Sequence, residues 1–117
     1  MATAPKTLAK MMIRAAYDKM AEDIVLLNLK KISSYTDYLV ILSAGSDTHA
    51  RTIADHLRER FKKKDVILHV EGYESGNWIL IDCFTVVVHI FRPDVREYYG
   101  LEKFWGDAER EEFPDGL

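Results

Sequence analysis

The chain has 117 residues, of which 48% are hydrophobic and 30% charged, a balance typical of one globular domain over residues 1–117. Its formal net charge is −3, whereas nucleic-acid-binding domains usually carry a basic excess, so little direct nucleic-acid binding is expected. The single cysteine, Cys83, excludes an intramolecular disulfide and a multi-cysteine zinc site.

The first third of the chain is expected to form a helix and two strands. Residues 6–20 place apolar side chains at helical spacing, after a proline that suits a first turn. No run there approaches the core of a signal peptide or the ~18 apolar residues of a membrane-spanning helix. We therefore expect a cytoplasmic protein without membrane contact. Residues 24–29 and 38–43 are almost continuously apolar and predict strands, the second covered on both faces.

A second helix is expected after the turn at Gly45, with Ser46 or Asp47 as its cap, and it runs to about Lys63. A short strand over residues 66–70 follows. A strand, a crossover helix and a strand favour a parallel pair, so the strand that ends before Gly45 is expected to pair with this one.

A β-hairpin is expected next. Residues 78–82 and 85–91 predict two strands, and the short link Cys83-Phe84 joins them. Pro93 ends the second strand.

The C-terminal segment is short and rich in aromatic residues. Asp94 is expected to cap a short helix over residues 95–99, which Gly100 ends. Residues 108–117 are polar and are expected to fray. Together the elements predict an α/β (α+β) fold: a mixed sheet of about five strands with two main helices and a short C-terminal helix.

The turn Gly45-Ser46 opens a helix, and such a turn can hold a phosphate on backbone N–H groups. Nucleotidyltransferases of the polymerase-beta type combine such a turn with two carboxylates, spaced i and i+2 on a neighbouring strand, that hold two metal ions. Here the strand after the helix offers only Glu71, and the i+2 neighbour of Asp82 is Phe84. Because the carboxylate pair is missing, we expect no catalytic residues, no metal and no cofactor.

For the histidines and the cysteine, we favour structural roles over metal binding or catalysis. His49 and His56 are seven residues apart on the expected helix, whereas a metal-binding pair is commonly four apart. His89 is expected to be half-buried and hydrogen-bonded to a carboxylate such as Asp82, with general-base catalysis as the alternative. Cys83 has no visible activating base.

Aromatic residues instead favour binding. Five side chains of the types that dominate protein interfaces lie at the hairpin start and near the C-terminus: Trp78, Tyr98, Tyr99, Phe104 and Trp105. The alternative is that this segment closes the core. We expect Tyr99 and Leu101 to close the core, Trp78 to be partly exposed, and Glu102 and Trp105 to remain available.

Three blocks of motifs run in order over about residues 23–107. They are Thr36–Ile41 with Ser43–Ser46 and Ala50–Asp55, then Glu71–Gly72 with Asn77–Asp82 and Val86–Phe91, then Arg96–Trp105. Each block alone is weak. Together, with Trp-x-x-x-Asp, Val-His and Tyr-x-Leu-Glu-x-x-Trp, they are specific, and the chain resembles the ribosomal silencing factor family, also called the Iojap family.

This resemblance implies a fold like that of the nucleotidyltransferases, without their catalytic carboxylates. It also implies a non-enzymatic function. Such factors bind the large ribosomal subunit through large-subunit ribosomal protein fourteen at the subunit-joining face, keep the small subunit away, and silence translation when nutrients are scarce. Organelle relatives aid large-subunit assembly. The family usually has a glycine-acid turn in the hairpin where this chain has Phe84-Thr85, which adds a ring near the expected contact surface.

The family blocks imply partner-binding residues on the hairpin and the C-terminal segment: Trp78, Leu80, Asp82, His89, Tyr99, Leu101, Glu102 and Trp105. Trp78 would be buried against the partner, while Asp82 and Glu102 would pair with cations of a basic protein. Two rivals stay open. One is a residual nucleotidyltransferase that binds nucleotide and magnesium. The other is a homodimeric scaffold whose aromatic patch pairs with itself, since the family tends to dimerise.

Overall fold

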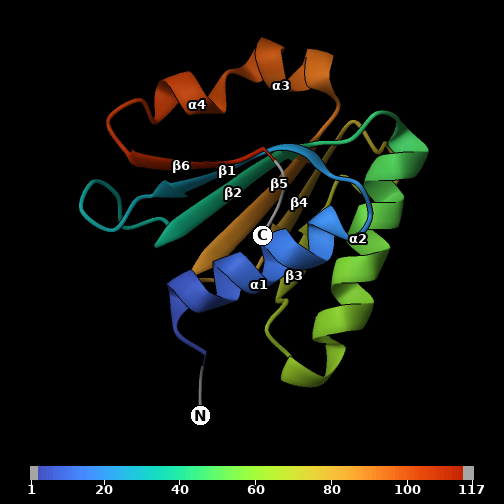
Figure 1. Ribbon diagram of the computed structural model, residues 1–117, viewed down its shortest axis with the longest axis horizontal. Coiled ribbons are helices and arrows are strands. Elements are labelled where there is room, and N and C mark those ends of the chain that lie inside the picture. The colour runs from blue at the N-terminus through green and yellow to red at the C-terminus, as the bar shows by residue number, and fades with distance from the viewer. Residues whose placement is uncertain (1–2, 115–117) are drawn as a thin grey trace.

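A mixed sheet separates two layers of helices in the computed structural model, which describes residues 3–114 (Figure 1). The helices are α1 (Pro5–Tyr17), α2 (Asp47–Phe61), the 3-10 turn η1 (Lys62–Lys64), α3 (Pro93–Tyr99) and α4 (Leu101–Phe104). The strands are β1 (Glu22–Asn28), β2 (Tyr38–Ser43), β3 (His69–Glu71), β4 (Trp78–Asp82), β5 (Val86–Phe91) and β6 (Glu109–Phe113). These elements confirm the predicted α/β (α+β) fold class.

The strands lie in the order β3-β4-β5-β2-β1-β6. β2 and β5 form a parallel pair, with Tyr38 opposite Val86. The prediction that the strand after α2 pairs in parallel with β2 is therefore wrong. That strand is β3, which lies at the sheet edge and pairs antiparallel with β4. After α2 the chain forms β3 at the sheet edge and then β4 beside it, and β5 lies between β4 and β2. β4 and β5 form the predicted hairpin.

The larger core lies between the sheet and the layer formed by α1 and α2. Every residue of β2 and β5 is buried, which explains their continuous apolar runs. α2 buries one stripe that includes Ile53 and Leu57. Its start follows the prediction, because the Ser46 hydroxyl accepts a hydrogen bond from the His49 N–H at 3.0 Å.

The opposite face of the sheet carries a smaller core under α3 and α4 (Figure 1). α3 begins at Pro93, and Arg92 rather than Asp94 occupies the cap position. Proline fits a first helical position because its φ is fixed and its missing N–H would be unpaired there. Gly100 ends α3 with φ 58°, as expected.

Residues 109–113 do not fray as predicted but form β6, which pairs antiparallel with β1 from Asn28–Glu109 to Ile24–Phe113. Four of its five side chains are exposed and charged. Such charges protect a sheet edge from pairing with another chain. The last part of the expected frayed tail, residues 115–117, lies outside the described residues.

Candidate functional site

Alternate residues of β4 form a row on the sheet face that also carries α3 and α4. Trp78, Leu80 and Asp82 are half-buried, whereas Ile79 and Ile81 are fully buried in the larger core. A strand sends successive side chains to opposite faces, so the first three point the same way. We call Trp78, Leu80 and Asp82 the β4 row.

Trp78 is held on several sides. Its indole N–H donates a hydrogen bond to Nδ1 of His89 at 2.9 Å. Its ring stacks on Phe91 at 4.9 Å between centroids, and Tyr99 lies 4.7 Å away on the same measure. Because these contacts fix the ring while part of it stays exposed, a partner could bury it at little entropic cost. The predicted partial exposure of Trp78 is confirmed.

His89 is 4% exposed and lies opposite Leu80 across the β4–β5 pair. Burial lowers the pKa of His89 to about 4. The imidazole is therefore neutral, and its Nδ1 can accept the bond from Trp78. The prediction that His89 bonds Asp82 is wrong, because Trp78 supplies its hydrogen-bond partner.

Asp82 stands at the far end of the β4 row from Trp78. Its Oδ1 accepts a hydrogen bond from the Phe84 N–H at 2.8 Å. Burial raises the pKa of the Tyr35 phenol, and the nearby carboxylates of Asp82 and Glu71 raise it further. This corner of the sheet therefore combines two acids with the exposed aromatic rings of Tyr35 and Phe84.

In the C-terminal segment, the residues that pack on the core and the residues that are exposed differ in part from the prediction. Leu101 packs against the smaller core as expected, and Trp105 also packs there while part of its ring stays exposed. Tyr99 is 54% exposed, so it does not close the core; it covers part of Trp78.

Glu102 was expected to remain available, and this expectation is wrong. Its Oε2 accepts from Nε of Arg96 at 2.8 Å and its Oε1 pairs with Nη1 of Arg110 at 2.9 Å. Arg96 also donates to the Ser43 hydroxyl and the Asp23 carbonyl, both at 2.8 Å. The hydrogen bond from Arg96 is the main cause that lowers the pKa of Glu102. Its carboxylate thus ties α4 to α3 and β6.

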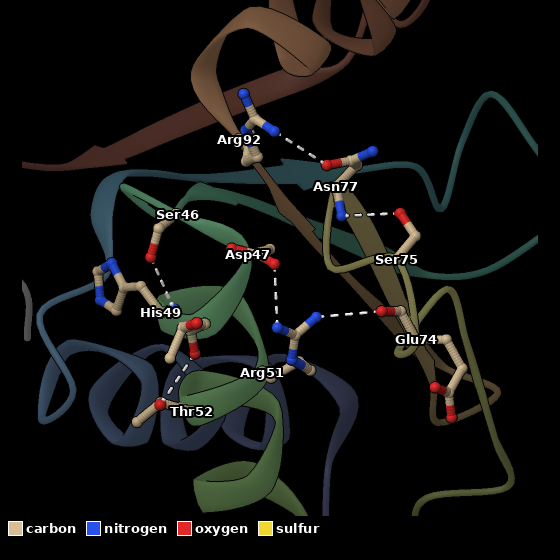
Figure 2. A network of polar contacts seen from close by, with 10 residues as sticks. Ser46, Asp47, His49, Arg51, Thr52, Glu74, Ser75, Asn77 and Arg92 are labelled. Carbon is tan, nitrogen blue, oxygen red and sulfur yellow. Dashed lines mark hydrogen bonds and ion pairs between the residues drawn. The ribbon is translucent and has the colours of Figure 1, made fainter.

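In the turn before α2, backbone N–H groups donate hydrogen bonds to side chains of the same segment (Figure 2). The Gly45 N–H donates to Nδ1 of His49 at 2.9 Å, and the His49 N–H donates to the Ser46 hydroxyl at 3.0 Å. Nε2 of His49 lies 2.7 Å from the Lys19 carbonyl. A phosphate at this turn would have to displace these bonds.

Arg51 joins the first turn of α2 to the loop that leads into β4 (Figure 2). It pairs with Asp47 at 3.0 Å and donates to the Glu74 carbonyl at 3.1 Å. At the end of that loop, Arg92 donates to the Asn77 side chain at 3.1 Å. These contacts fix the residue before Trp78, and the sequence alone carried no signal for them.

Within residues 3–114, no three side chains of His, Cys, Asp or Glu gather in a way that could hold a metal ion. Nor does that part of the chain contain a helix with the length and apolar character to cross a membrane.

The sequence matches the family model described as "Ribosomal silencing factor during starvation" over residues 2–116. The chain belongs to the ribosomal silencing factor family. It is 42% identical over 102 residues to the ribosomal silencing factor RsfS of Halalkalibacterium halodurans, across 86% of this chain and 87% of that protein. These matches confirm the resemblance seen in the motif blocks.

The structure is similar to the crystal structure of a protein from Chromobacterium violaceum, with a TM-score of 0.85 and 32% sequence identity over 89% of this chain and 88% of that one. The chain is also 30% identical to the mouse protein named "Mitochondrial assembly of ribosomal large subunit protein 1", over 81% of this chain and 43% of the mouse protein. The family therefore places this chain among proteins of translation regulation and ribosome biology.

Proposed function

We propose that this protein is a non-enzymatic repressor of translation that acts in the cytoplasm. It binds the large ribosomal subunit and sterically keeps the small subunit away when nutrients are scarce. Family membership supports the silencing role, and a relative named for large-subunit assembly supports the choice of subunit. The partner that the family resemblance implies is large-subunit ribosomal protein fourteen, a protein of the subunit-joining face.

The observation that carries this proposal is the held, half-exposed ring of Trp78 at one end of the β4 row. A rigid aromatic side chain at one end of the row and acidic side chains at the other suit a basic protein surface, because burial supplies affinity and charge supplies orientation. In this proposal Trp78, Leu80, Asp82 and Tyr99 touch the partner.

The remaining residues of the implied set do not touch the partner in this proposal; they hold the contacting residues in position. His89 holds Trp78 in place, and Leu101, Glu102 and Trp105 hold the C-terminal segment over the sheet. Nucleotide transfer is not supported, because the N–H groups that would bind a phosphate are already bonded within the turn at Gly45.

The test is sucrose-gradient cosedimentation with purified large subunits, followed by addition of small subunits. The natural protein is expected to travel with large subunits and to lower the intact-ribosome peak. Leu80→Lys places a cation in the middle of the β4 row and is expected to weaken binding about tenfold or more. Tyr17→Lys is the matched control, because Tyr17 is 42% exposed on α1, across the sheet.

If the natural protein stays at the top of the gradient, the proposed function is wrong. Self-association through the exposed rings of Tyr98 and Tyr99 is the second candidate, since these are 82% and 54% exposed. A molar mass that rises with concentration in light scattering, and falls in Tyr98→Ala, would favour it.

A further inference from the structure

Phe84 lies at the tip of the β4–β5 hairpin in a backbone conformation that suits glycine. Its φ is 69°. The Thr85 N–H donates to the Cys83 carbonyl at 2.8 Å, which makes Phe84 the central residue of a three-residue γ-turn. Residues with a Cβ are disfavoured at such φ values, whereas glycine adopts them freely.

Side chains from two segments hold this conformation. The Phe84 N–H donates to Asp82 at 2.8 Å, and the hydroxyl of Thr36 donates to the Phe84 carbonyl at 2.9 Å. Thr36 itself is 5% exposed. Both polar backbone groups of Phe84 are therefore bonded, so the strained turn is firmly specified.

The Phe84 side chain gains little from this arrangement within the chain. It is 72% exposed, while the preceding Cys83 is buried in the larger core. A glycine would close the same turn without strain and without an apolar ring in water. Neither turn chemistry nor core packing therefore explains why phenylalanine occupies this position.

Phe84 follows the β4 row directly, in the turn at its Asp82 end. Ile81 and Cys83 lie in the larger core, whereas the Phe84 ring is exposed outside it. At roughly 3.3 Å per residue, β4 spans about 13 Å from Trp78 to Asp82, so the two aromatic residues stand at opposite ends of the strand. That length fits within one standard protein interface.

We propose that Phe84 is a second apolar anchor of the surface that binds the large-subunit protein, and that the strained turn presents its ring to that partner. This inference rests on the proposed function and names a further contact at the same surface. The occupant is the basic protein proposed above, because the carboxylates of Asp82 and Glu71 lie between and beside the two aromatic ends. A hydrophobic contact at each end of an acidic patch would fix the orientation of the partner.

The decisive variant is Phe84→Gly, tested by anisotropy of labelled protein titrated with purified large subunits. It removes the ring and the strain together. We expect affinity to fall about fivefold to tenfold, while the urea unfolding midpoint stays the same or rises. Phe84→Ala removes the ring but keeps the strain, so it should lose affinity without gaining stability. Phe104→Ala is the control, because Phe104 is 75% exposed on α4 and outside the β4 row.

The outcomes separate this inference from the proposed function. If Leu80→Lys loses binding while Phe84→Gly binds like the natural protein, the inference is wrong and the proposed function stands. If the natural protein does not bind large subunits, both are wrong. A lower unfolding midpoint for Phe84→Gly would show that the ring serves the fold, and would also overturn the inference.

Discussion

The indole N–H of Trp78 donates to Nδ1 of His89 at 2.9 Å, so a half-exposed ring of the proposed binding surface depends on a buried imidazole. Only the neutral form of His89 has a lone pair at that nitrogen. The bond therefore couples the protonation state of the sheet interior to the position of the surface ring.

The first prediction concerns pH and His89. The pKa of His89 falls from 6.5 to about 4 because the ring is buried, so between these values the unfolded chain binds more protons than the folded one. Stability should therefore be complete above the unfolded value and decline as pH falls toward 4, by about 2 kcal/mol between about pH 7 and pH 5. Urea unfolding at both pH values measures this.

The control for that prediction is His89→Gln, whose side chain does not titrate. Whatever the stability of this variant at pH 7, its loss between the two pH values should be smaller than that of the natural protein. Equal losses would contradict the role of His89, since other groups would then carry the whole pH dependence.

A second prediction concerns the carboxylate of Glu102. Glu102→Gln removes the charge that pairs with Arg96 and Arg110, and stability should fall by about 1 to 2 kcal/mol. Because these partners lower the pKa of Glu102, the contribution is present above the ordinary carboxyl value and declines as pH falls through the folded value. Thermal unfolding measures the loss.

Glu97→Gln provides the comparison for Glu102, because Glu97 is an exposed carboxylate on the same segment. It should change stability little. If both variants lose the same amount, the ion pairs of Glu102 do not hold the C-terminal segment in place.

The sequence predicted the fold through its apolar runs, and it failed where such runs are absent. β2 and β5 are buried along their whole length, so their apolar runs predict strands directly. β6 has one neighbouring strand and mostly charged, exposed side chains, so its sequence resembles that of a frayed terminus and does not predict a strand. The predicted parallel partner of β2 is wrong because a strand-helix-strand pattern predicts a parallel pair but does not say which later strand completes it. Here β5, and not β3, pairs with β2.

The sequence predicts which residues belong to the candidate site better than it predicts the contacts that they make. Trp78 stands out as a tryptophan at the start of a strand, and its partial exposure follows from the turn before it. The partners of Glu102 do not follow, because Arg96 and Arg110 lie on different elements that meet only in the folded chain. Likewise, the choice of Trp78 over Asp82 as the partner of His89 depends on side-chain reach across the hairpin.

A third prediction concerns Gly72, which lies in the loop before β4. Its φ is 77°, and a Cβ added there would lie 2.0 Å from the Trp78 carbonyl oxygen. Gly72→Ala should therefore cost about 2 kcal/mol or more and displace the start of β4. Gly45→Ala is the matched control, because its Cβ would meet nothing closer than His49 at 3.8 Å.

Chemical denaturation compares the two glycine variants. Gly45→Ala should change stability by less than about 1 kcal/mol. If Gly72→Ala is equally mild, the loop before β4 tolerates movement, and Trp78 is less firmly held than its contacts indicate.

The last prediction separates two roles of Asp82, which accepts the Phe84 N–H and carries charge in the β4 row. Asp82→Asn keeps an oxygen that can accept this bond but removes the charge. We expect it to keep most of the stability and to weaken large-subunit binding about threefold to tenfold at low salt, with a smaller salt dependence. Asp82→Ala loses the bond as well, so its stability should fall by about 1 kcal/mol.

Binding titrations at several salt concentrations, with urea unfolding of the same variants, measure both effects. Glu111→Gln is the control, because Glu111 is an exposed carboxylate on β6, at the opposite edge of the sheet. Natural affinity for Asp82→Asn at low salt would remove the acidic contact from the proposed surface. A stability of Asp82→Asn as low as that of Asp82→Ala would instead mean that the turn needs the charged acceptor, and that Asp82 serves chiefly to hold Phe84 in its strained conformation.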